Sequence, residues 1–174
     1  MNLAPTSSTT SMLVLGDALA MTLLEARGFV KEDFAKLHPG GSLGRTLLTK
    51  VSDIMRTDKD FCTVAPDTTL KHALEKMTDY RSGSVVVIGK ESELLGILTQ
   101  GDFVRSIQKN CNILDEEVAN FMTKNPITIR EDRLAAEVIQ VIGSNRIDDL
   151  VVTDEQGNAI GLVDSQDLSR MKLI

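Results

Sequence analysis

The chain contains two copies of one short pattern, which begin at Gly96 and at Gly161. The first copy reads GILTQGDF over residues 96–103, and the second reads GLVDSQDL over residues 161–168. Each copy predicts an apolar strand, a turn and a helix with an aspartate in its first turn. One such segment is common, but two copies in matching surroundings indicate an internal repeat, which constrains the fold more than any single segment does.

The similarity extends on both sides of this pattern. The segment VSDIM at 51–55 matches VANFM at 118–122, and each is followed by the same series of predicted elements. These are a short strand (61–64 and 126–129), a helix (68–77 and 134–142), a strand (84–88 and 150–153), a strand (95–99 and 160–163) and a helix (101–108 and 165–171). The unit is thus β-α-β-β-α, twice. A unit of roughly 60 residues buries too little surface to be stable alone, so we expect the two units to pack face to face.

Composition and charge restrict the kinds of partner. Aromatic residues make up only 3% of the chain and Trp is absent, so the core is predicted to be aliphatic. The net charge is −6, and Lys and Arg form no basic stripe, which argues against nucleic acid as a partner. A small anionic ligand is still compatible with this charge, because backbone N–H groups and a few local cations can bind a phosphate.

The cysteines and the N-terminus point to an ordinary cytoplasmic protein. Cys62 and Cys111 are far apart and lack metal-ligand spacing, so we expect two reduced thiols, no metal and no cofactor. No uninterrupted apolar run approaches the roughly 18 residues of a membrane span, and no signal peptide is visible. The sequence therefore predicts a cytoplasmic protein that does not contact a membrane.

The first 45 residues differ in character from the repeats. Residues 9–27 predict a helix that is apolar on most sides, although nothing in the next 25 residues could cover it. The loop HPGGSLGR at 38–45 follows, in which glycines allow a ligand to approach the main chain closely. Considered alone, His38 is an ordinary loop histidine.

The order of these segments resembles a known family. LAPTSST at 3–9, the apolar helix, and the pattern F-A-x-x-H-P-G-G-S-L-G-R at 34–45 resemble the C-terminal end of the sugar-isomerase (SIS) domain of D-arabinose 5-phosphate isomerases. The resemblance implies that His38 takes part in the aldose–ketose interconversion as an acid or base. It also places the remaining catalytic groups upstream of LAPTSST. Residues 1–45 are therefore expected to be a remnant of an SIS domain, and the 174 residues alone are expected to be inactive.

The repeats resemble a tandem pair of cystathionine-β-synthase-type (CBS) domains, over 46–110 and 111–174. The predicted fold class is therefore α/β (α+β): tandem β-α-β-β-α repeats packed as a pseudo-twofold pair, preceded by the remnant of an α/β SIS domain. Arabinose 5-phosphate isomerases commonly carry such a pair after the HPGG loop, so the two resemblances support each other.

The second resemblance implies a nucleotide in the clefts between the two domains. Thr99 and Asp102 match the family motif G-h-h-[ST]-x-x-D, whose hydroxyl and carboxylate hold ribose; the alternative is that they only cap a helix. In repeat two Asp167 is retained, but Asp164 replaces the hydroxyl residue and adds negative charge near any phosphate. The implied nucleotide-binding residues are Thr63, Val64, Ser84, Val85, Thr99 and Asp102 in repeat one, and Thr128, Ile129, Asp149, Leu150 and Asp167 in repeat two. The arginines placed to neutralise phosphate are Arg81, Arg105, Arg146 and Arg170, unless they are ordinary solvated surface residues.

Three functions therefore remain open. The first is a regulatory module that binds an adenine or a cytidine nucleotide, CMP-Kdo among them, because the pathway of the resembled family leads to the Kdo of lipopolysaccharide. The second is isomerisation of arabinose 5-phosphate to ribulose 5-phosphate, with sugar phosphate binding only in a complete SIS domain. The third is a structural clamp with empty clefts. In each case we expect a homodimer or a tetramer.

Overall fold

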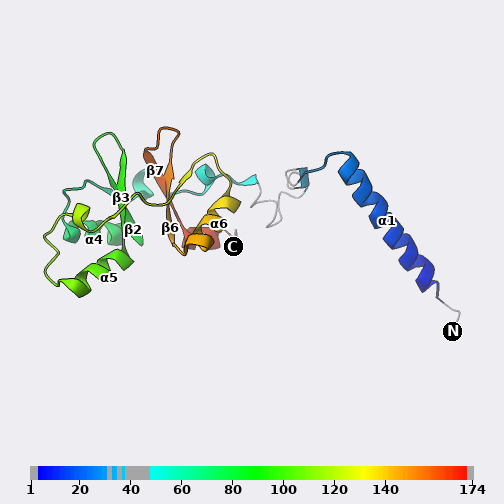
Figure 1. Ribbon diagram of the computed structural model, residues 1–174, viewed down its shortest axis with the longest axis horizontal. Coiled ribbons are helices and arrows are strands. Elements are labelled where there is room, and N and C mark those ends of the chain that lie inside the picture. The colour runs from blue at the N-terminus through cyan, green and yellow to red at the C-terminus, as the bar shows by residue number, and fades with distance from the viewer. Residues whose placement is uncertain (1–3, 31–32, 35–36, 38–47, 172–174) are drawn as a thin grey trace.

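The structure, a computed structural model, describes residues 4–30, 33–34, 37 and 48–171. Figure 1 shows a compact body built from the repeats, with one long helix at the N-terminal end standing apart from it. The helices are α1 (Thr6–Ala26), α4 (Leu70–Asp79), α5 (Gln100–Lys109), α6 (Ala135–Asn145) and α7 (Ser165–Arg170). The strands are β1 (Thr63–Val64), β2 (Ser84–Ile88), β3 (Leu94–Thr99), β4 (Thr123–Lys124), β5 (Thr128–Arg130), β6 (Asp149–Thr153) and β7 (Ala159–Asp164). Short 3₁₀ helices lie at Val51–Asp53, Asp58–Asp60 and Val118–Asn120.

The strands form two sheets with matching topology. The first has the order β1-β2-β3-β4 and the second the order β5-β6-β7. In each, the first strand pairs in parallel with the second, which pairs antiparallel with the third. The two hairpins share one register, because Ser84 lies opposite Thr99 and Asp149 lies opposite Asp164. The structure confirms the predicted fold class for the repeats: β-α-β-β-α, twice.

The two sheets face each other, and helices cover their outer sides. Along β2, Val85 and Val87 pack in a cluster with residues of α4, whereas Val86 points to the opposite face. There Val86 joins a third buried cluster with Val151 and Leu162 of the other sheet. This alternation follows from the two-residue period of a strand, and it explains why the central strands are apolar on both faces.

The segment that enters each repeat packs on the other repeat. Val51 and Ile54 lie in the core of repeat two, and Val118 lies in the core of repeat one. The backbone follows the same exchange, because the N–H of Val51 donates to the carbonyl of Arg133 at 2.9 Å. Packing therefore crosses the boundary at residues 110 and 111 that the sequence predicts between the domains.

The glycines that begin the two motif copies lie beneath these exchanged segments. A Cβ atom at Gly96 would lie 2.7 Å from Met122 Sδ and 2.8 Å from the carbonyl oxygen of Thr123. At Gly161 a Cβ would lie 2.8 Å from the carbonyl oxygen of Arg56. Only a residue without a side chain allows so close an approach of two backbones, which explains the glycine in both copies.

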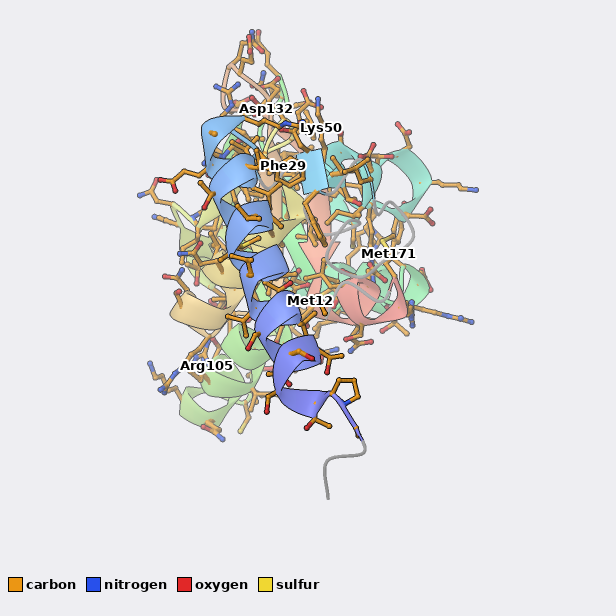
Figure 2. The ribbon with its side chains drawn as sticks, turned by 90° about the vertical axis from the view of Figure 1, so that its right-hand side faces the viewer. Met12, Phe29, Lys50, Arg105, Asp132 and Met171 are labelled. Atoms are coloured by element: carbon orange, nitrogen blue, oxygen red, sulfur yellow. The ribbon has the colours of Figure 1, made fainter. Side chains whose placement is uncertain are left out.

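The helix predicted at residues 9–27 is present as α1, and none of its residues is buried. Figure 2 shows its side chains, Met12 among them, spread around the helix, and Met12 is 65% exposed. By length and composition alone α1 could cross a membrane, because an 18-residue window within it reaches a mean hydropathy of 1.2, although no uninterrupted apolar run has that length. The Ser and Thr residues of α1 interrupt its apolar runs, but they lower its mean hydropathy little. Core helices of soluble proteins and signal sequences can have the same length and composition. His38 lies outside the described residues.

Candidate functional site

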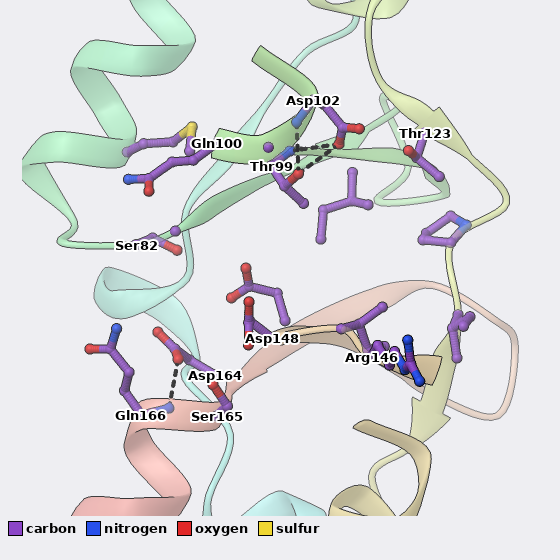
Figure 3. A pocket seen from close by; sticks show the side chains of 18 of the residues that line it. Ser82, Thr99, Gln100, Asp102, Thr123, Arg146, Asp148, Asp164, Ser165 and Gln166 are labelled. Carbon is purple, nitrogen blue, oxygen red and sulfur yellow. Dashed lines mark hydrogen bonds between the residues drawn. The ribbon is translucent and has the colours of Figure 1, made fainter. Parts of the chain in front are cut away.

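A cleft of about 1030 Å³ separates the two repeats. Figure 3 shows that one wall carries Ser82, Thr99 and Asp102 of repeat one, and the opposite wall carries Asp148 and Asp164 of repeat two. Its lining includes residues 81–83, the β3–α5 junction at 99–102, residues 123, 125–127 and 146–149, and the β7–α7 junction at 164–166. The volume is close to the upper limit of the range of small-molecule sites, and residues of both repeats line the cleft.

The motif of repeat one lies on this cleft as a closed network at the start of α5. The carboxylate of Asp102 accepts hydrogen bonds from the backbone N–H of Thr99 at 3.0 Å and from its hydroxyl at 2.8 Å. In return the N–H of Asp102 donates to the Thr99 hydroxyl at 3.1 Å. This is a capping box, so the capping role that the sequence predicts as an alternative is confirmed. Because both residues also line the cleft, capping does not exclude contact with a ligand.

The charge of Asp102 is stabilised where it lies. Burial raises the pKa of Asp102, but hydrogen bonds from Thr99 and Arg105 outweigh it, so the net pKa is below its ordinary value. The Arg105 guanidinium reaches the second oxygen of Asp102 at 2.6 Å, and its own side chain is 67% exposed. Asp102 is therefore an ionised acceptor, and one of its oxygens accepts a hydrogen bond from Arg105, an exposed side chain that can move into solvent.

The same motif in repeat two has different partners. Asp164 accepts a hydrogen bond from the N–H of Gln166 at 2.8 Å and so caps α7. Its other oxygen lies 3.0 Å from the guanidinium of Arg56, and Asp167 lies 2.5 Å from Nε of the same arginine. The hydrogen bond with Asp167 raises the pKa of Arg56 above its ordinary value, and burial only partly opposes this rise. Asp164 lines the cleft, whereas Asp167 does not.

Two buried polar atoms lie where the repeats meet, at the start of β2 and of β6. Ser84 Oγ and Asp149 Oδ1 are buried and have no hydrogen-bond partner within normal distance. Burial, followed by the nearby Asp164 carboxylate, raises the pKa of Asp149 to about 6; the Ser84 hydroxyl and Arg56 oppose this rise. Asp149 lines the cleft, so the cleft contains a carboxyl that changes its charge near neutral pH.

Three of the four predicted phosphate-neutralising arginines line the cleft: Arg81, Arg105 and Arg146. The backbone at Arg81 and at Arg146 is left-handed, with φ of 49° and 53°, and each follows a helix. Arg170 does not line the cleft, and its guanidinium lies 3.4 Å from Asp167. The cations of the cleft therefore lie mainly at the turns after α4 and α6.

The remaining predicted residues do not line the cleft: Thr63, Val64, Ser84, Val85, Thr128, Ile129 and Leu150. Val64, Val85 and Leu150 are at most 4% exposed, because their side chains pack in the core clusters between sheet and helices. Their contact with a nucleotide stays a prediction.

Two further lining residues, Thr123 and Asp148, were not predicted from the sequence. Neither was Arg56, which forms ion pairs with Asp164 and Asp167. The repeat register could have found Thr123 and Arg56, since both follow the methionine of the segments VANFM and VSDIM. Within the described part of the chain, no three His, Cys, Asp or Glu residues are placed to hold a metal.

The CBS domain model matches this chain over residues 51–109 and 118–173. The arabinose 5-phosphate isomerase KdsD of Pseudomonas aeruginosa is 45% identical over 170 residues, which are 98% of this chain and 52% of that protein. The arabinose 5-phosphate isomerase KpsF of Escherichia coli is 40% identical over 93% of this chain and 49% of its own length. The chain thus spans about half the length of the curated relatives it matches.

Solved structures show the same fold. The CBS domain pair of protein MJ0100, in complex with 5-methylthioadenosine and S-adenosyl-L-methionine, has a TM-score of 0.64 at 24% identity, covering 71% of this chain and 94% of that one. The structure of CBSX2 in complex with AMP has a TM-score of 0.63 at 22% identity, covering 72% of this chain and 96% of that one. The matched family model covers more than half of the residues, which shows that the chain belongs to the CBS domain family.

Proposed function

We propose that the chain is the regulatory CBS-pair region of an arabinose 5-phosphate isomerase and that its cleft binds a nucleotide or nucleotide-sugar. The observation that carries the proposal is the cleft itself, with the Thr99–Asp102 network on its wall. Solved CBS pairs of the same fold were obtained in complex with AMP or S-adenosyl-L-methionine, which supports a nucleoside ligand here. The curated isomerase relatives support the context of a regulated enzyme.

The geometry gives each group a role in this proposal. Ribose hydroxyls donate to the Asp102 carboxylate, which is ionised and acts only as an acceptor. They replace Arg105, whose exposed guanidinium then turns to the phosphate. Arg81 and Arg146 line the same cleft.

The charge of the cleft limits the number of phosphates. Its lining includes the carboxylates of Asp102, Asp148, Asp149 and Asp164 beside the three arginines. A triphosphate would bring more negative charge than these cations can neutralise. We therefore expect nucleoside monophosphates and CMP-sugars such as CMP-Kdo to bind more tightly than ATP.

Titration calorimetry with AMP, ATP, CMP and CMP-Kdo tests the proposal. We expect a dissociation constant on the order of 10 μM for at least one of them, equivalent to about 7 kcal/mol. Thr99→Ala should weaken binding at least tenfold, because it removes both the ribose contact and part of the network that orients Asp102.

Thr69→Ala is the matched control. Thr69 caps α4 by accepting a hydrogen bond from the N–H of His72, as Thr99 caps α5, but it does not line the cleft. It should lower stability without changing affinity. If none of the four nucleotides produces heat at millimolar concentration, the sensing role is refuted and the alternative of a ligand-free dimerisation module gains support.

The enzymatic part of the proposal concerns the whole protein. We propose that a chain of the relatives' full length isomerises D-arabinose 5-phosphate to D-ribulose 5-phosphate, and that the ligand acts only through a difference in affinity between two conformations. An assay of ribulose 5-phosphate formation should detect no turnover by these 174 residues. Measurable turnover by them would contradict the division of roles proposed here.

A further inference from the structure

We propose that each CBS pair takes a single nucleotide, on the Thr99–Asp102 wall, because Arg56 pairs with both carboxylates of the equivalent motif in repeat two. This inference rests on the proposed function and specifies which half of the cleft is used.

The repeat register makes three positions equivalent. Gly96 matches Gly161, so Thr99 corresponds to Asp164 and Asp102 to Asp167. Met55 matches Met122, so Arg56 corresponds to Thr123. The structure supports the second alignment, because Thr123 pairs with Ile97 in β3 and Arg56 forms a bridge with Leu162 in β7.

The wall of repeat one is open at these positions. Thr99 and Thr123 are short hydroxyl residues that both line the cleft with Asp102, and Figure 3 shows the three side chains along one wall. The cation near them is Arg105, which comes from the solvent side of α5 and is 67% exposed. A ligand can therefore replace Arg105 without leaving a charge buried.

The wall of repeat two is closed at the same positions. Arg56 contacts Asp164 at 3.0 Å and Asp167 at 2.5 Å, and it also donates to the carbonyl of Arg81 in repeat one at 3.3 Å. The side chains of the two ion pairs are only 9–14% exposed. The carboxylate of Asp167, which corresponds to the ribose acceptor Asp102, is thus held away from the cleft by an internal cation.

The two sequence differences between the repeats, Arg56 in place of Thr123 and Asp164 in place of Thr99, depend on each other electrostatically. Arg56 in place of threonine would leave a partly buried cation without a full set of partners if position 164 carried a hydroxyl. Asp164 alone would add another carboxylate beside Asp149 and Asp167, where a phosphate would have to bind. Together they form a charge-compensated cluster, and a ligand that broke it would leave a carboxylate or a guanidinium buried without its partner.

The experiment exchanges the two walls and counts bound nucleotide by calorimetry with AMP and CMP as probes. The wild-type chain should bind one equivalent. The double variant Arg56→Thr, Asp164→Thr recreates the open wall and should bind a second equivalent. The reciprocal variant Thr99→Asp, Thr123→Arg recreates the closed wall and should lose at least tenfold in affinity for the first. Circular dichroism checks that both variants fold.

A second measurement needs no variant. In ¹⁵N–¹H spectra of the wild-type chain, saturating AMP or CMP should shift the amides of Thr99, Gly101 and Asp102, and leave those of Ser165 and Gln166 within a small fraction of these shifts. Two equivalents on the wild type, or larger shifts at the start of α7, would overturn the single-site inference while leaving nucleotide binding intact. No binding by the wild type or by either variant would overturn the proposed function and the inference together.

Discussion

At the scale of single residues, Asp149 is the group whose surroundings depart most from those of an ordinary carboxyl. It faces Asp164, Asp148, Arg56 and Ser84, and one of its oxygens is buried without a partner. Its pKa of about 6, against an ordinary 3.8, means that the folded protein keeps a proton which the unfolded chain releases. Ionisation of Asp149 therefore opposes folding, and the free energy of unfolding should fall as the pH rises from about 4 to 6.

The first prediction is that Asp149→Asn removes this pH-dependent fall in the free energy of unfolding. Ionisation of Asp149 lowers that free energy by roughly 3 kcal/mol at most, from about two pKa units at 1.36 kcal/mol each. At pH 7.5 the variant should be more stable than the wild type by on the order of 1–3 kcal/mol, and near pH 4 the two should be equal. Urea unfolding followed by circular dichroism between pH 4 and 7.5 measures this difference in the free energy of unfolding.

Asp154→Asn is a control of opposite sign. Hydrogen bonds from Asn158, the largest cause, hold the pKa of Asp154 below its ordinary value at the exposed turn between β6 and β7. Its ionised form favours folding, so its substitution should lower stability above pH 4 and not raise it. A pH profile of Asp149→Asn parallel to that of the wild type would show that Asp149 is not the group concerned.

At the scale of elements, the exchange of the entry segments determines how the repeats are joined. Each segment adds backbone pairing to the outer strand of the other repeat, through β4 with β3 and through Arg56 with Leu162. The contact requires a residue without a side chain at Gly96 and at Gly161. The same contact brings Thr123 to the cleft and places Arg56 against Asp164 and Asp167, so the packing of these segments also sets the difference between the two walls.

The second prediction is that Gly96→Ala destabilises the protein by about 1–3 kcal/mol, as expected for overpacking in a tight contact. The neighbour at 2.8 Å is a backbone oxygen, which cannot turn aside as a side chain can. Thermal or urea unfolding gives the value.

Gly143→Ala is the matched control for this substitution. Gly143 lies within α6, and a Cβ there meets nothing within 4 Å. The change should stabilise by up to about 1 kcal/mol through helix propensity. Equal effects at the two positions would refute the packing explanation.

At the scale of the whole molecule, α1 is not packed into the core of the CBS pair. Large side chains along α1 are exposed, and none of its residues is buried, whereas the pair has three buried clusters of its own. An apolar helix of this length is normally covered on most sides. We propose that the sheet of the SIS domain covers it in the whole protein.

The third prediction is that removal of residues 1–30 leaves the unfolding midpoint of the pair within about 2 °C of the wild type, which corresponds to less than about 1 kcal/mol. Leu98→Ala, at a fully buried position in the core of repeat one, should instead cost about 2–5 kcal/mol. Differential scanning calorimetry compares the three proteins. A large fall on removing α1 would mean that the helix contributes to the stability of the pair.

The sequence alone determined the repeat, the order of elements in each unit and the capping residues Thr99 and Asp102, because these depend on local periodicity and on hydrogen bonds between near neighbours. It could not show that the entry segments change sides, since exchanged and unexchanged packing have the same local pattern. Only the tertiary structure placed Arg56 against Asp167, 111 residues apart, and against Asp164. These ion pairs close the wall of repeat two at the position where repeat one has the Thr99 hydroxyl. Long-range ion pairs of this kind arise from the packing of whole units, which sequence spacing does not encode.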